Sequence, residues 1–445
     1  MRAFSFLHCA DLHLGATIKT LTGLPTEFGP RLINAPIAAL DRIVTTAIEK
    51  KVAGVIMAGD VFDNTHPSSV HSYAALRDRL QKLGAAGIPT FIVTGNHDPL
   101  DNTVSNIVSP ELVHFFGTKV DDIPLMRGDE ILAHIYGVSY GTSRETKNLA
   151  TDFPSKPKGP FSIAVLHTNV AGQTGHDSYA PCELADLVER EFDYWALGHV
   201  HTRKTLREKG PVVHYPGNVQ GLHRNEEGPR GVTLVEVASD GSVEISPVWT
   251  DTIRWHREET SIDDLKSVGD VMDMFAKITD KISGDSPDQL NIVSWKLNGS
   301  GPVHAELRNP MAHDGLVEAL REKHAPEPHD GAVWLRQLND ETSPARDIDQ
   351  LRKQQDLLGN LLTLAEKARH NPGPRVSAGI DNDLDSSSSN QVSSEIEMEL
   401  EELLGSPDLY KALGEDPWRA IDWNRVLARS EVRSINELLD KDVDP

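Results

Sequence analysis

The chain has 445 residues, 38% of them hydrophobic and 25% charged, which is enough for one large domain with its own core and one or two smaller ones. Its formal net charge of −23 argues against a protein that holds nucleic acid by electrostatics alone, because that affinity comes from lysine and arginine that displace counterions from phosphates. No apolar run approaches the roughly 18 residues of a membrane span, and Cys9 and Cys182 are too few for a disulfide framework or a thiolate metal site, so we expect a cytoplasmic chain that does not cross a membrane.

The first 250 residues are predicted to form a layered α/β domain, because short apolar strands alternate with amphipathic helices and each strand ends in polar residues. Helices are expected at residues 36–51 and 68–86, where apolar residues recur at helical spacing. Asp240-Gly241 is a hairpin signal between the last two strands of this region. The expected strands are residues 4–9, 54–58, 90–94, 131–137, 163–166, 194–197, 231–237 and 243–248.

The remaining residues divide into four predicted segments. The pattern of strand, helix, strand, helix, strand across residues 251–340 indicates a small α/β accessory domain that caps the first one. A helical segment at 341–370, a linker at 371–394 rich in Pro, Gly, Asp and Ser, and a helical tail at 395–445 follow. In the tail, Ile396, Leu400 and Leu403 share one helical face. This stripe is too narrow for an independent core, so we expect a partner to cover it, with homodimerisation as the alternative.

Five short polar motifs each follow a predicted strand of the first domain. In an open α/β sheet, the loops beyond the carboxyl ends of the strands converge on one crevice, so ligands far apart in the sequence can meet there. Their carboxylate, amide and imidazole groups suit Mn²⁺, Fe²⁺ or Zn²⁺ rather than a cysteine-type structural zinc. The motifs are Asp11-Leu12-His13, Gly59-Asp60, Gly95-Asn96-His97-Asp98, His167 within Leu-His-Thr-Asn, and Gly198-His199-Val200-His201.

These residues suggest specific roles at a two-metal site. Two cations that clamp a phosphate need a bridging carboxylate to offset their repulsion, and Asp60 is the candidate for it. His97 is then expected to stabilise the transition state and to protonate the departing oxygen, with Asp98 as the residue that orients it. The expected ligands are Asp11, His13 and His201 for one metal, and Asn96, His167 and His199 for the other.

Two further features admit more than one interpretation. His66 follows the bridging Asp60 closely enough to reach a phosphate, but a plain loop histidine before Pro67 is the favoured interpretation. The loop that carries His214, His223, Arg224 and Arg230 either faces the substrate or forms a solvated surface.

The five motifs, together with Asp63 in Gly59-Asp60-Val61-Phe62-Asp63, resemble the complete signature of calcineurin-like metallophosphoesterases. Within that superfamily, three segments resemble the SbcD-type DNA repair nucleases, and especially their YhaO-like branch. The resemblance covers residues 1–250, and more weakly the residues up to about 340. The segments are Phe-Leu-His-Cys-Ala-Asp-Leu-His-Leu-Gly at 6–15, Gly-Asp-Val-Phe-Asp at 59–63, and Tyr215-Pro216-Gly217-Asn218 with Gly228-Pro229-Arg230-Gly231.

The resemblance implies a metallophosphoesterase β-sandwich flanked by helices, with the accessory domain and the helical tail attached. It implies a nuclease that usually depends on two Mn²⁺ ions, acts on DNA ends in repair as an exonuclease, and also cuts single-stranded or structured ends. It further implies an SMC-like ATPase as partner, on which the helical segment after the accessory domain docks. Two other functions stay open: a phosphomonoesterase acting on nucleotides or phosphoproteins, and a non-catalytic scaffold that binds DNA ends.

Overall fold

The computed structural model describes residues 1–18, 24–63, 70–100, 110–155, 157–170, 179–324, 331–345, 352–353 and 362–363. These residues form two compact units, one of which comprises 1–260, 268–297 and 309–340. The predicted linker 371–394 and tail 395–445 lie outside the described residues, as does most of the predicted helical segment 341–370. The domain bounds therefore stay a prediction.

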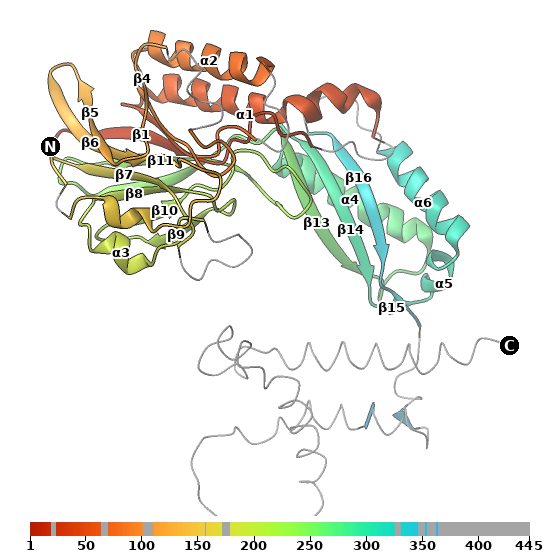
Figure 1. Ribbon diagram of the computed structural model, residues 1–445. Helices are drawn as coiled ribbons and strands as arrows, with labels where there is room; N and C mark the ends of the chain where they lie inside the picture. The colour runs from red at the N-terminus through yellow and green to blue at the C-terminus, as the bar shows by residue number, and fades with distance from the viewer. Residues whose placement is uncertain are drawn as a thin grey trace, which may run out of the picture. The chain divides into compact units, whose positions relative to one another are not determined.

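Two six-stranded sheets make up the larger part of the first unit (Figure 1). The first has the order β12-β11-β1-β2-β3-β4, in which β1 to β4 run parallel and β11 is antiparallel to β1. The second has the order β5-β6-β7-β8-β10-β9, in which β6, β7, β8 and β10 run parallel between antiparallel edge strands. Their bounds are β1 Phe4–Cys9, β2 Val55–Ala58, β3 Thr90–Val93, β4 Val113–Phe115, β5 Asp121–Arg127, β6 Glu130–Val138, β7 Ser162–His167, β8 Tyr194–Gly198, β9 Lys204–Arg207, β10 Val212–Tyr215, β11 Gly231–Val237 and β12 Val243–Trp249.

Helices cover both outer faces of this sandwich. Helices α1 (Gly29–Lys50) and α2 (Val70–Ala85) pack on the first sheet, where Leu40 and Leu80 meet strand residues such as Met57. A second apolar cluster, which includes Phe6 and Val165, fills the space between the sheets. A third cluster joins the outer face of the second sheet to α3 (Leu184–Val188). The predicted α/β class, a layered sandwich flanked by helices, is confirmed.

Helix α1 begins seven positions before the predicted start, at Gly29 rather than Pro36. A proline is most favourable in the first turn of a helix. In the structure Pro30 takes that place and the helix continues through Pro36. The additional turns have a packing role, because Phe28 and Leu32 lie in one apolar cluster with strand residues of the accessory sheet.

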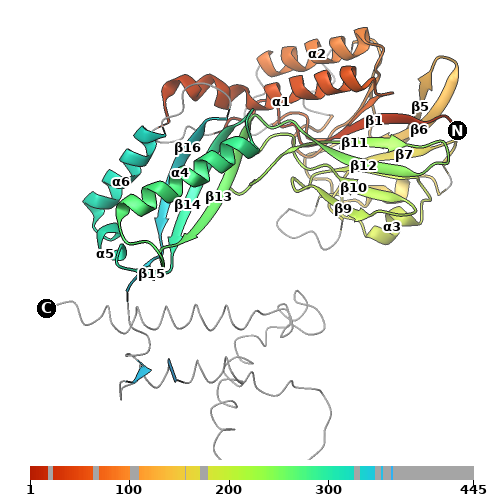
Figure 2. The same cartoon turned by 180° about the vertical axis from the view of Figure 1, so that it is seen from behind.

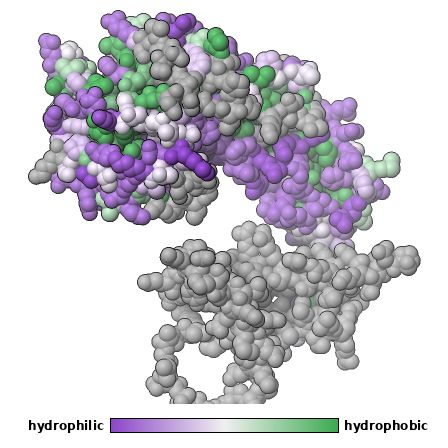
Figure 3. All heavy atoms as spheres, in the orientation of Figure 1, coloured by the Kyte–Doolittle hydropathy of each residue, from purple (hydrophilic) through white to green (hydrophobic). Residues whose placement is uncertain are grey.

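The accessory sheet has the order β13-β14-β16, with helices α4 (Val268–Asp285) and α6 (Pro310–Lys323) along one face (Figure 2). Phe275 of α4 packs on Trp295 of β14, with ring centroids 5.1 Å apart. The face without these helices is largely hydrophilic in the space-filling view (Figure 3) and carries the Lys296–Glu259 ion pair. The strands are β13 Ile253–Ser261, β14 Leu290–Asn298 and β16 Val333–Asp340.

Among the described residues, the second compact unit comprises 261–267, 298–308, 341–345, 352–353 and 362–363. Its described part contains the two-residue strands β15 (Ser300–Gly301) and β17 (Ser343–Pro344), which pair in parallel, and the short helix α5 (His304–Leu307). Across the described residues of the whole chain, no helix combines the length and the apolar character that crossing a membrane requires.

Candidate metal centre

The five sequence motifs lie at the carboxyl ends of β1, β2, β3, β7 and β8. Backbone hydrogen bonds tie the first two loops together: the Asp11 N–H donates to Gly59 O, and the His13 N–H donates to Asp60 O. Asp11, His13, Asp60 and His199 all have φ between 46° and 101°, in the left-handed region that non-glycine residues rarely adopt. Backbone strain of this kind concentrates at functional sites, where the surrounding fold enforces it.

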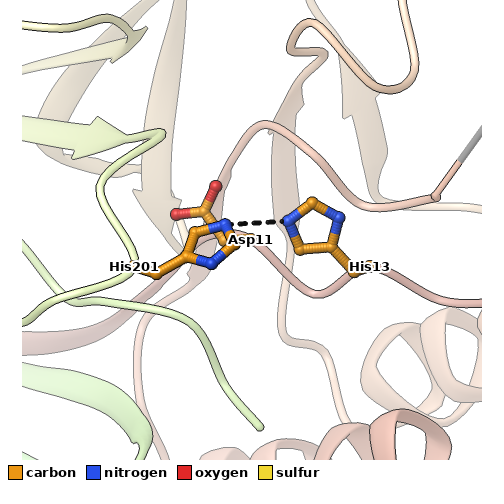
Figure 4. Close-up of side chains that lie close together, drawn as sticks. All are labelled: Asp11, His13 and His201. Carbon is orange, nitrogen blue, oxygen red and sulfur yellow. Dashed lines mark hydrogen bonds between the residues drawn. The ribbon is translucent and has the colours of Figure 1, made fainter. Parts of the chain in front are cut away.

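The first group of potential ligands contains Asp11, His13 and His201, whose donor atoms all lie within 4.8 Å of one another. Figure 4 shows the two imidazoles facing each other with the Asp11 carboxylate close by, Asp11 and His13 from the loop after β1 and His201 from the loop after β8. The two Nε2 atoms are 3.1 Å apart. Two nitrogen lone pairs at that distance repel each other unless a proton or a cation lies between them, so this geometry fits a cation site.

The second group contains Asp60, His167 and His199, again with donor atoms within 4.8 Å. The Oδ1 atom of Asn96 is 3.1 Å from Nε2 of His167. On the opposite side of that ring, Nδ1 lies 2.9 Å from the Ala58 carbonyl oxygen, which can only accept. In the neutral ring the hydrogen is therefore on Nδ1, and Nε2, which faces the site, is the nitrogen that can coordinate a cation.

The Asp60 carboxylate lies between the two groups. It is 2% exposed, and its Oδ2 atom is 3.3 Å from Nε2 of His167 and 3.9 Å from Nε2 of His13. Its Oδ1 atom accepts the backbone N–H of His97 at 2.9 Å. A side chain added at Gly95 would collide with both Asp60 and His167, so the loop after β3 needs glycine to approach this closely. Asp60 thus has the position that a bridging ligand requires.

Burial and neighbouring charges shift the pKa values of these ligands. Burial lowers the pKa of His13 to about 3, so this imidazole is neutral at neutral pH and free to coordinate. Burial alone would raise the pKa of Asp60, but His167 outweighs it and holds that pKa well below its usual range. Burial would likewise lower the pKa of His167, but the Asp60 carboxylate raises it to about 9. A cation that binds there must therefore displace a proton from His167.

His97 is oriented by a residue other than the predicted one. Its Nδ1 atom lies 3.1 Å from Oδ1 of Asp63, and the His97 side chain is about one-third exposed, at 32%. The prediction that Asp98 orients His97 is wrong. Asp98 is fully buried and accepts three backbone N–H groups, from Val61, Phe62 and Gly95, at 2.7, 3.2 and 2.7 Å. These bonds leave Asp98 holding the loops after β2 and β3 together.

His97 also lies within 4.8 Å of donor atoms of His13 and Asp60, so its nitrogen shares the space of the ligand groups. Sequence reasoning gave it a catalytic role because both sets of ligands are complete without it. The geometry is compatible with that role, and metal content in a His97 variant distinguishes it from a ligand.

Glu226 is a residue of the site that the sequence did not single out. Its Oε1 atom lies 2.6 Å from Nδ1 of His201, and the side chain is buried. The loop that carries Glu226 has a structural role as well, since Arg230 donates to the backbone carbonyl of His201 at 2.6 Å.

The other residues that the sequence left open lie in different environments. His214 is buried among threonine hydroxyls, whereas His223 and Arg224 are exposed. His66 lies outside the described residues.

The donor set fits divalent transition metals. Imidazole nitrogens, carboxylate oxygens and the amide oxygen of Asn96 surround the two positions, and such mixed nitrogen and oxygen ligands suit Mn²⁺, Fe²⁺ and Zn²⁺. Cys9 and Cys182 are buried free thiols that belong to neither group.

Two family models match the chain. The model of calcineurin-like phosphoesterases matches residues 4–203, and the model of the middle domain of metallophosphoesterase YhaO matches residues 255–343. The first therefore covers all five motifs of the site, and the second covers the accessory sheet except for the first two residues of β13.

Three curated proteins have sequences similar to this chain. The uncharacterised metallophosphoesterase YhaO of Bacillus subtilis is 31% identical over 352 residues, which cover 78% of this chain and 84% of that protein. The DNA double-strand break repair protein Mre11 of Sulfurisphaera tokodaii is 27% identical, covering 54% of this chain and 61% of that protein. The SbcD component of the nuclease SbcCD of Bacillus subtilis is 25% identical, covering 52% of this chain and 65% of that protein. The chain thus spans less than two-thirds of the length of these last two relatives.

Proposed function

Since the chain belongs to the calcineurin-like metallophosphoesterases, a family of hydrolases that use two divalent metals, we propose that it hydrolyses DNA phosphodiesters in DNA repair. In this proposal it is an exonuclease that also cuts single-stranded or structured ends, and its metals are Mn²⁺. The observation that carries the proposal is the position of Asp60 between two groups of ligands, with His97 beside them.

Each side chain then has a defined task. The ligands are Asp11, His13 and His201 for one ion, Asn96, His167 and His199 for the other, and Asp60 for both. Two divalent ions bound there supply Lewis acidity that activates water and offsets the charge of the phosphoryl oxygens. His97, whose Nδ1 atom contacts Asp63, donates a proton from Nε2 to the departing oxygen of the DNA strand.

The choice of DNA over other phosphate esters is supported by the relatives. Two of them carry DNA double-strand break repair or nuclease in their names. A phosphomonoesterase would use the same ligands and differ in the groove around them. Rates on a nucleotide monoester, a small chromogenic phosphodiester and a DNA duplex therefore test the proposal. We expect both diesters to be hydrolysed well above the monoester, and a clear preference for the monoester would reject DNA as the substrate.

A partner is part of the proposal, because a chain with a net charge of −23 holds duplex DNA weakly at physiological salt. We propose that an SMC-like ATPase supplies the DNA clamp in the cytoplasm and binds the residues from about 340 onward, including the apolar stripe of Ile396, Leu400 and Leu403. Replacing Leu400 and Leu403 together by glutamate in the full chain should abolish co-purification of the ATPase and leave small-diester hydrolysis unchanged. Unchanged ATPase binding would place the docking segment elsewhere, and a dimer lost in the variant would favour self-association.

A further inference from the structure

We propose that Glu226 is a positioning residue that fixes the imidazole of His201 for binding one of the two metals. This inference rests on the metal-binding part of the proposed function. Glu226 is 5% exposed, and its two carboxylate oxygens have separate tasks. Oε1 contacts Nδ1 of His201 at 2.6 Å, and Oε2 accepts the backbone N–H of Leu222 at 2.6 Å. The carboxylate therefore cannot turn without losing one of two short hydrogen bonds.

The contact determines which nitrogen of His201 carries the hydrogen. A carboxylate accepts hydrogen bonds and donates none, so Nδ1 of His201 must be the donor. The Nε2 atom then keeps its lone pair, and it is Nε2 that faces Nε2 of His13 at 3.1 Å. Carboxylates that bond the second nitrogen of a ligating histidine fix both its tautomer and its ring orientation.

The same loop also holds the backbone of His201. Arg230, four residues after Glu226, donates from a guanidinium nitrogen to the His201 carbonyl oxygen at 2.6 Å. The loop is anchored in turn to β13, where Glu227 forms a bridge with Trp255 and the Gly228 N–H donates to the Trp255 carbonyl at 2.9 Å. His201 is thus clamped at its ring and at its main chain by one loop.

Only one of the two ligand groups depends on this clamp. In the other group, the ring of His167 is fixed by the carbonyl oxygen of Ala58, at 2.9 Å from Nδ1, with no contribution from Glu226. Loss of the Glu226 carboxylate should therefore weaken one metal and spare the other. If Glu226 acted only through its negative charge, its loss would weaken the binding of both metals.

The test uses the full chain with Glu226→Gln, and with Glu227→Gln as the matched control. Glu227 follows directly in the loop and forms an exposed ion pair with Arg257, so its variant removes the same charge without touching His201. The proteins are stripped with a chelator and titrated with Mn²⁺ by calorimetry, and bound ions are counted after dialysis. We expect two ions in the wild type and in E227Q. In E226Q, one ion should bind as in the wild type and the other about 10-fold to 100-fold more weakly.

Several results would overturn the inference. It would be overturned if E226Q bound both ions with wild-type affinity, or if metal binding in E227Q weakened as much as in E226Q. Fewer than two ions bound to the wild type would also overturn it. A structural role is tested by the unfolding temperature of the chelator-treated proteins, which should agree within about 4 °C. A larger drop in E226Q would assign Glu226 to fold stability instead. The titration measures metal binding without DNA, so it is independent of the nuclease assay. A wild type that binds two ions but cuts no DNA in the nuclease assay would reject the proposed nuclease and leave this inference standing.

Discussion

Oδ1 of Asp63 lies 3.1 Å from Nδ1 of His97. This contact links the loop after β2 to the residue that is proposed to protonate the leaving group. Burial alone would lower the pKa of His97, but the hydrogen bond to Asp63 and the charge of Asp60 raise it. The pair therefore keeps the imidazole protonated to higher pH than a free histidine.

Replacing Asp63 by asparagine should lower kcat about 10-fold to 100-fold, because His97 loses the carboxylate that orients its ring and raises its pKa. The pKa of His97 should fall, so the alkaline limb of the rate profile should move to lower pH. We would measure kcat against pH on a small phosphodiester, with metal content by elemental analysis. The exposed Asp152→Asn is the control. An unshifted profile, or loss of metal, would contradict this role for Asp63.

Replacing Asp98 by alanine should destabilise the fold rather than act on catalysis directly. Three buried backbone N–H groups lose their acceptor, and each costs about 1–3 kcal/mol when left without a partner. Urea unfolding of the metal-free protein measures the loss, and the exposed Asp78→Ala should change it by less than about 0.5 kcal/mol. A stable but inactive Asp98→Ala would restore the orienting role expected from the sequence.

The sequence predicted which residues of the motifs meet in the structure, because their positions follow from a local pattern. Each motif directly follows an apolar strand, and the carboxyl ends of parallel strands meet at one edge of a sheet. The partners of His97 and His201 depend on tertiary contacts instead. Asp98 is adjacent to His97 in the sequence but bonds to backbone N–H groups of its own loop and of the loop after β2, while Glu226 reaches His201 from 25 residues away. No local spacing distinguishes such residues from other loop carboxylates.

Several strands were missed for a related reason. Strand β5, Asp121–Arg127, is an edge strand that begins with two aspartates and contains Pro124, residue types that are depleted in strands. Strands β4, β9 and β10 each contain a histidine or charged side chains, so they lack the apolar run that marks the equally short β2 and β3. By contrast, the bounds of β1 and β11 agree with prediction because their apolar runs end in clear polar or glycine signals.

Metal affinity at the second group should rise with pH, because the pKa of His167 is about 9 without metal. Below that pH the cation must displace the proton from His167, so the affinity should increase about tenfold per pH unit from about pH 7 to 9. Calorimetric titrations of Mn²⁺ in buffers with different ionisation enthalpies should reveal release of about one proton for this ion. An affinity that is constant over this range would contradict the protonated state of His167.

Two histidines buried between the sheets should make the fold sensitive to acid. Burial lowers the pKa of His8 to about 3 and that of His214 to about 2, whereas both have a pKa near about 6.5 in the unfolded chain. Below about pH 6.5 these histidines take up protons in the unfolded chain but stay neutral in the folded chain. The free energy of unfolding therefore falls by up to about 1.4 kcal/mol per pH unit for each histidine.

The variant His214→Gln isolates one of these contributions, since glutamine can still bond Thr205 and Thr233. Its unfolding free energy, measured in urea at several pH values without metal, should decline less steeply than that of the wild type between about pH 6.5 and 5. Parallel curves for the two proteins would show that His214 is not a neutral buried group.

The most direct test of the proposed nuclease is digestion of end-labelled single-stranded and duplex DNA with Mn²⁺, comparing the wild type with His97→Ala. The account predicts metal-dependent shortening from the labelled ends by the wild type, abolished by a chelator. His97→Ala should retain both ions and lose at least about 100-fold in rate, because it lacks the proton donor. Intact DNA in the wild-type reaction while a nucleotide monoester is hydrolysed, or undiminished cutting by His97→Ala, would contradict the account.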